Sequence, residues 1–136
     1  MNISPVTTIA ASTAALIWAV KAVAIGAFGR DSYDDPVTSA LFVLGLVAFV
    51  VGAVSLAWTA LRGRHLVLRV LGATGAVVLG AGFAAATTPV FESLVDSWVG
   101  AELNLWILAG VLLAVVARGS AGGATRAHDT EVASGT

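Results

Sequence analysis

Hydrophobic residues run along this chain in four long, nearly uninterrupted segments that short polar stretches separate. A helix needs about 20 mostly apolar residues to cross the roughly 30 Å hydrocarbon core of a bilayer. No segment alternates apolar and polar residues with period two, as the strands of a membrane barrel do. The pattern therefore predicts an all-α integral membrane protein, a four-transmembrane-helix bundle with spans at residues 6–28, 36–61, 66–88 and 101–117.

The third polar connection has a helical pattern of its own. In PVFESLVDSW, residues 89–98, apolar side chains recur at helical spacing, while Glu92 and Asp96 share the opposite face. Pro89 is typical of the first residues of a helix. We therefore expect a short interfacial helix before the fourth span, with Trp98 at headgroup level.

Composition strengthens the membrane interpretation, because 58% of the 136 residues are hydrophobic and only 11% are charged, with a mean hydropathy of +0.95. A soluble domain of this size buries only about two thirds of its unfolded-chain surface and could not hide so many apolar side chains. We expect the lipid bilayer to solvate residues 1–118 as one four-helix domain. Residues 119–136 are glycine-rich and polar without periodicity, which predicts a disordered cytoplasmic tail.

Charge is distributed unequally among the connections. Arg62, Arg64 and Arg69 surround the second connection and Arg118 follows the fourth span, whereas the first and third connections are acidic. Because lysine and arginine accumulate in cytoplasmic loops, this predicts a multi-pass plasma-membrane protein with both termini in the cytoplasm. The net charge of −1 leaves no basic patch for phosphates, so no nucleic-acid partner is expected.

The only lysine of the chain, Lys21, interrupts the first span in ALIWAVKAVAIGAF. A lysine at the centre of a span costs about 2.5–3.5 kcal/mol on insertion scales. It either snorkels to the membrane surface or has a partner inside the bundle. With the N-terminus inside, Lys21 lies about 10 Å below the outer end of its span, and its side chain leans away from that surface. Depth and direction both favour an internal partner.

Two polar residues that open the fourth span, Glu102 and Asn104, complete a candidate intramembrane polar site with Lys21. They lie about 200° apart around a helix, so we expect that they cannot both face the bundle squarely. Asn104 is nearer to Lys21 in depth, whereas Glu102 has the opposite charge. The alternative for Glu102 is a carboxylate stabilised by the positive end of its own helix, and a Lys21–Glu102 pair could also be purely structural.

The remaining residues with chemical potential have simpler interpretations. Glu92 and Asp96 form at best a weak cation site and are better explained as a solvated face. His65 and His128 are too far apart in the chain to suggest a metal site. Trp18 is within reach of Lys21 for a cation–π contact, although core filling is the favoured role. Aromatic residues that we expect to anchor span ends at the interface are Tyr33, Trp58, Trp98 and Trp106.

Two local patterns concern helix ends and helix contacts. Asp35 followed by Pro36 is typical of an N-cap and the first helical position. Small residues four apart, which let membrane helices approach closely, recur in the first three spans. They include Ala11, Ala15 and Ala19, then Ala48 and Gly52, and finally Ala76, Gly80 and Ala84.

No pattern predicts an enzyme or a cofactor, because the chain has no nucleophile motif, metal-ligand spacing, phosphate-binding loop or cysteine. Small multidrug transporters have this length but use a carboxylate in the first span, where this chain has Lys21. Four-helix thiol oxidases need cysteines, and b-type membrane cytochromes need paired histidines.

Two functions remain. The favoured one is a non-catalytic accessory or assembly component of a larger membrane complex. The alternative is a small oligomeric transporter or channel subunit that uses Lys21 with Glu102 or Asn104. Few other polar groups occur in the spans, which favours the first. The accessory interpretation expects another membrane protein as partner, and the transporter interpretation expects a homo-oligomer.

Overall fold

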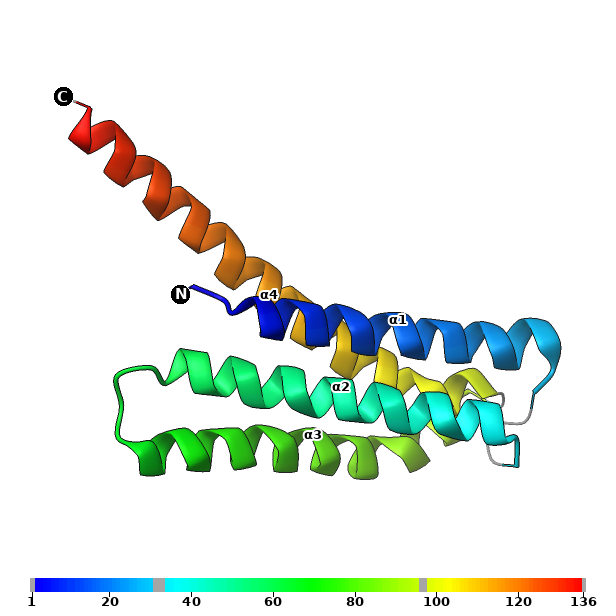
Figure 1. Ribbon diagram of the computed structural model, residues 1–136. Coiled ribbons are helices and arrows are strands. Elements are labelled where there is room, and N and C mark those ends of the chain that lie inside the picture. The colour runs from blue at the N-terminus through cyan, green and yellow to red at the C-terminus, as the bar shows by residue number, and fades with distance from the viewer. Residues whose placement is uncertain (1, 31–33, 96–97, 136) are drawn as a thin grey trace.

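Four helices make up the computed structural model, which describes residues 2–30, 34–95 and 98–135. The helices are α1 (Pro5–Phe28), α2 (Pro36–Ala60), α3 (Leu66–Leu94) and α4 (Trp98–Ser134). Each contains a segment long and apolar enough to cross a membrane, as the sequence predicts. Successive helices run in opposite directions (Figure 1). Contacts join α1 to α2, α2 to α3, α3 to α4 and α4 back to α1, so the bundle is a ring of neighbours.

Local sequence signals determine where the first two helices begin and end. The Ser4 side chain accepts a hydrogen bond from the Val6 N–H at 3.3 Å, just ahead of Pro5. Gly29 ends α1 in the left-handed conformation, with φ 61°, which only glycine adopts without strain. Asp35 caps α2 and Pro36 is its first residue, as expected. The chain therefore leaves α1 at Gly29 and enters α2 after Asp35.

The separate interfacial helix expected over residues 89–98 is not present. Residues 89–94 are the last turns of α3, and α4 begins at Trp98; Asp96 lies outside the described residues. Pro89 has no N–H to donate, yet the helix continues past it. The carbonyl that loses its helical donor at Pro89 is that of Ala85, whereas the hydroxyls of Thr87 and Thr88 donate to the carbonyls of Phe83 and Ala84, each at 2.7 Å.

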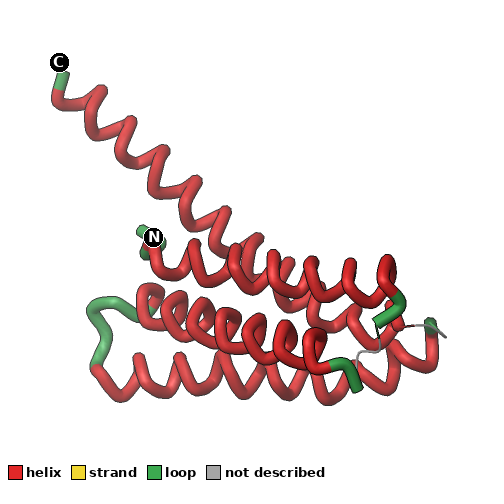
Figure 2. Tube along the Cα trace, turned by 45° about the vertical axis from the view of Figure 1, so that its right-hand side comes forward, coloured by secondary structure: helices red, strands yellow, loops and turns green. Residues whose placement is uncertain are grey.

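The tail also differs from the expectation of disorder. α4 continues without a break to Ser134, and its C-terminal part, residues 119–134, projects away from the bundle (Figures 1 and 2). Adding residues to an existing helix avoids the cost of nucleation, so a preceding apolar helix extends into a polar segment more readily than that segment would fold alone. We call residues 119–134 the arm.

The apolar core lies among α1, α2 and α4. Trp18 is its largest fully buried side chain, 1% exposed, and it stacks on Phe49 with 5.7 Å between ring centroids. Trp18 thus fills the core, the favoured of its two expected roles. Gly52 lies where three helices meet, because a β-carbon there would be 3.2 Å from Leu112 Cδ2 of α4 and 3.4 Å from the Ala11 backbone nitrogen of α1. The other buried members of this core are Ala11, Ala14, Ala53, Leu105, Ala109, Leu112 and Val116.

The predicted anchor tryptophans are near helix ends and have aromatic or cationic neighbours. The Arg69 guanidinium lies over the Trp58 ring, 4.0 Å from its centroid. Trp98 and Trp106 meet edge to face at 6.2 Å. Tyr33 lies outside the described residues.

Candidate functional site

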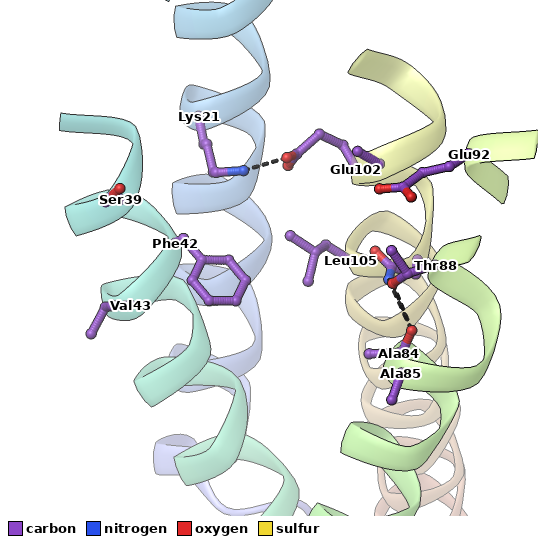
Figure 3. A pocket seen from close by; sticks show the side chains of 12 residues that line it. Lys21, Ser39, Phe42, Val43, Ala84, Ala85, Thr88, Glu92, Glu102 and Leu105 are labelled. Atoms are coloured by element: carbon purple, nitrogen blue, oxygen red, sulfur yellow. Dashed lines mark hydrogen bonds and ion pairs between the residues drawn. The ribbon is translucent and has the colours of Figure 1, made fainter. Parts of the chain in front are cut away.

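An ion pair between α1 and α4 is the centre of the candidate site. The Lys21 Nζ donates to Oε1 of Glu102 across 81 positions of sequence. Lys21 is only 3% exposed and Glu102 only 4%. The contact is visible in Figure 3, where Lys21 reaches sideways from α1 toward α4. The structure thus brings together two of the three residues singled out in the sequence.

Asn104 is buried as well, 5% exposed, although we expected that it and Glu102 could not both face the bundle. That expectation is wrong because it assumed a single inward direction. In the ring of helices α4 has α1 on one side and α3 on the other. Glu102 therefore contacts α1 while Asn104, on another side of the same helix, contacts α3.

Asn104 bonds to the part of α3 that precedes Pro89. Its Nδ2 donates to the Thr88 hydroxyl at 2.7 Å and to the Ala84 carbonyl at 3.4 Å. Thr88 in turn donates to the same carbonyl. Asn104 thus links α4 to α3. Neither of its two hydrogen bonds goes to Lys21. Thr88 directly precedes Pro89, the residue that the interfacial-helix interpretation treated as a helix start.

Two buried acceptor atoms of these side chains are left without a hydrogen bond. They are Glu102 Oε2 and Asn104 Oδ1, and neither has a partner among residues 2–30, 34–95 and 98–135. Leaving a buried acceptor unpaired costs about 1–3 kcal/mol, and more for a charged group. The site therefore has unused capacity to accept hydrogen bonds.

A cavity of about 430 Å³ is lined by both residues of the ion pair and by Asn104. It lies at the end of the bundle that carries connections 29–35 and 95–97, which we call the acidic end. All four helices line it, and Figure 3 shows Glu92 extending from α3 toward the same space. Its polar lining is Lys21, Ser39, Thr88, Glu92, Glu102 and Asn104, and its apolar lining includes Phe42, Val43, Ala84, Ala85 and Leu105.

Phe42 contributes to the site but was not among the residues predicted from the sequence. Its ring centroid lies 5.7 Å from the Lys21 Nζ, which is a cation–π contact. We had expected such a contact only from Trp18. Lys21 is about seven residues from the end of α1, and Phe42 about six from the start of α2, so an antiparallel hairpin brings them to similar depth. A depth comparison across the α1–α2 connection would have found it.

At the rim of the acidic end, Arg30 and Asp35 form a second ion pair. The Arg30 Nη1 donates to both carboxylate oxygens at 3.1 Å, and the Thr38 N–H donates to one of them at 3.4 Å. Burial by itself would raise the pKa of the Asp35 carboxyl. The hydrogen bonds from Arg30, Val37 and Thr38, with the positive charge of Arg30, more than offset burial and hold that pKa below its usual value.

The other candidate residues do not join this site. His65 and His128 are exposed, one before α3 and the other on the arm. Among the described residues no three histidine, cysteine, aspartate or glutamate side chains come together as a metal site. Asp96, the expected companion of Glu92, lies outside those residues.

Comparisons with known proteins add no information about this site. No family model, no curated protein and no solved structure matches the chain.

Proposed function

We propose that this chain is a multi-pass plasma-membrane protein with both termini in the cytoplasm, and that it serves as a non-catalytic accessory or assembly component of a larger membrane complex. Four helices of spanning length support the membrane placement. Their antiparallel order puts Arg62, Arg64 and Arg69 at the same end of the bundle as the N-terminus and Arg118. This basic end is the one that the positive-inside rule assigns to the cytoplasm.

The observation that carries the accessory role is the confinement of the buried charges to one end. Beneath the ion pair the interior is an apolar layer in which Trp18, Phe49 and Leu112 fill the space between helices. At the basic end the hydroxyl groups of Thr7 and Ser55 form a hydrogen bond with each other, with 2.6 Å between the oxygens. Among residues 2–30, 34–95 and 98–135 the polar groups at the two ends are separated by this apolar layer, and an ion pair that ties α1 to α4 suits a structural component.

The arm is a second feature that suits a partner-binding role. Its residues are mostly exposed, and Gly119, Gly122 and Gly123 each weaken a helix by about 1 kcal/mol relative to alanine. An isolated helix of this length is marginal in water. A surface that packs against the arm would stabilise it, so it is a reasonable point of attachment for another subunit.

Purification from native membranes in mild detergent tests the proposal. We expect the full chain to co-purify in fixed stoichiometry with a different membrane protein. A variant truncated after Arg118 should keep the bundle's thermal stability and lose part or all of that association. Recovery of a lone monomer or homo-oligomer would overturn the accessory role.

Reporter fusions test the orientation separately. A reporter inserted at Gly63, in the connection between α2 and α3, should be active in the cytoplasm, and one inserted at Gly29 should be active outside. The opposite result would reverse the proposed topology without affecting the accessory role.

The cavity favours a second candidate, the oligomeric transporter or channel subunit. Here Lys21 and Glu102 would line half of a pathway that neighbouring protomers complete. In liposomes, Lys21→Met should then abolish flux of a small ammonium ion, whereas Val20→Met, at a position 48% exposed on the same helix, should not. Unchanged flux in Lys21→Met would remove the lysine from the mechanism.

A further inference from the structure

We propose that the cavity at the acidic end binds a primary ammonium group supplied by another molecule. This ligand site does not depend on whether the chain is an accessory component or a transporter. The ammonium could belong to a free alkylamine or to an aminophospholipid headgroup, since both present the same three N–H donors.

The first step of the argument is that the cavity already holds an ammonium. The Lys21 Nζ bonds to Glu102 Oε1 and lies 5.7 Å from the Phe42 ring centroid. A carboxylate oxygen beside an aromatic face is a favourable environment for a compact cation. Lys21 is thus a tethered example of the group that this cavity recognises.

The second step is that two side chains lining the cavity have buried acceptors without a hydrogen bond. Glu102 Oε2 and Asn104 Oδ1 are unpaired within the described part of the chain, on side chains that are 4% and 5% exposed. Both atoms can only accept hydrogen bonds. A ligand must therefore bring donors, and an anion or an ether would leave both oxygens unsatisfied.

The charge of the lining selects a cation among donor-bearing ligands. The charged side chains that line the cavity are Glu92, Glu102 and Lys21, and their formal charges sum to −1. Among the described residues no cluster of three metal-binding side chains is present, so the donor atoms of an organic cation fit better than a bare metal ion. A primary ammonium supplies both the charge and enough donors for the two oxygens.

The third step concerns size and access. A volume of about 430 Å³ falls within the range of about 300–1,000 Å³ of small-molecule sites. Ser39, Val43 and Ala85 line the cavity and are themselves exposed, so it is open between α2 and α3. The apolar wall there accommodates an alkyl chain, while the polar end accommodates its ammonium.

Ligand-dependent thermal stability of the full chain in detergent, in a buffer without amines, tests the proposal. We use n-hexylammonium as the probe, with hexyltrimethylammonium and 1-hexanol as controls. Hexylammonium should raise the Tm saturably, and the trimethyl analogue, which has the charge but no N–H donor, should bind about tenfold more weakly or worse. Equal shifts with all three compounds, or none with hexylammonium, would overturn the proposal.

Variants separate ligand binding from a merely structural role. Asn104→Leu should weaken hexylammonium binding, whereas Thr74→Val, on the exposed face of α3, should leave it unchanged. Lys21→Met should increase the Tm shift that hexylammonium produces, because the ligand then takes over both oxygens of Glu102. Glu102→Gln, which removes the carboxylate charge, should also weaken hexylammonium binding. If that variant does not fold, Asn104→Leu and Lys21→Met test the site, and wild-type Tm shifts in both would refute it.

Nanodiscs distinguish the source of the ammonium. If the ligand is a headgroup, phosphatidylethanolamine should stabilise the protein more than phosphatidylcholine and should lower the apparent affinity for hexylammonium. If it is a free amine, hexylammonium should bind equally in both lipids. Loss of hexylammonium binding in both lipids would count against the site itself.

Discussion

Gly45 of α2 lies directly against the indole ring of Trp18 of α1, so that a β-carbon at position 45 would stand 2.2 Å from the indole Nε1. The ring has little room to move, because it is 1% exposed and stacks on Phe49. α1 and α2 can approach closely at this level because Gly45 has no side chain and leaves room for the indole of Trp18. This contact lies about one turn below the ion pair.

We therefore predict that Gly45→Ala destabilises the bundle. The added methyl group forces Trp18 out of place, and overpacking of this kind lowers the free energy of unfolding by about 1–3 kcal/mol, although alanine favours the helix itself. Gly82→Ala is the matched control on α3, because a β-carbon there meets no atom within 4 Å. Denaturant unfolding in detergent should show Gly82→Ala neutral or slightly stabilising. Equal effects of the two substitutions would mean that Trp18 can move aside.

The link between Asn104 and Thr88 leads to a second prediction. Asn104→Leu removes the 2.7 Å bond to the Thr88 hydroxyl and should lower the free energy of unfolding by about 0.5–2 kcal/mol, the range for polar contacts between apolar helices. Thr88→Val should have less effect in the Asn104→Leu background than in the wild type. Thr87→Val is the control, since Thr87 bonds only within α3. If Thr87→Val and Thr88→Val show the same dependence on residue 104, the interhelical bond contributes nothing.

Much of this fold was predictable because apolar length is a local property. The four helices follow from it, and so does the burial of Lys21, whose depth and side-chain direction depend only on its own helix. The partner of Lys21 was narrowed to two residues but not decided. That choice depends on which neighbours flank α4, and small residues at i and i+4 occur on too many faces to determine the order of helices.

The predictions that failed concern features that depend on tertiary contacts or on the extension of a preceding helix. Residues 89–94 show the same helical period whether they form a new helix or extend α3, and in the structure α3 continues past Pro89. Residues 119–134 have weak helical preference, yet α4 already supplies the nucleus. The cavity was invisible in the sequence because Phe42 and Ser39 look like ordinary apolar and polar positions of a span.

The Arg30–Asp35 pair gives a prediction about acid. The pKa of Asp35 is held below its usual value, so this group stabilises the folded state above its unfolded pKa of about 3.9. The stabilisation is lost as pH falls through the lowered folded-state pKa. Asp35→Asn should therefore have a lower Tm than wild type at pH 7, with the difference shrinking below about pH 4. Thermal scans from pH 7 to pH 3 check this, and a difference that stays constant would mean that the carboxylate charge has no stabilising role.

The final prediction concerns the Lys21–Glu102 pair. Lys21→Ala or Glu102→Ala alone should lower the free energy of unfolding by about 3–5 kcal/mol, because each leaves a buried charge without its partner. The double variant should be much less destabilised than the sum of the two, since neither charge remains. Replacement of both by apolar residues, Lys21→Met with Glu102→Leu, should restore stability close to that of the wild type, because well-packed hydrophobic side chains substitute for buried ion pairs at little loss. Unfolding of these variants in detergent measures the coupling directly. Additive effects would show that the two groups act independently, with the ammonium solvated elsewhere and the carboxylate held by its own helix terminus.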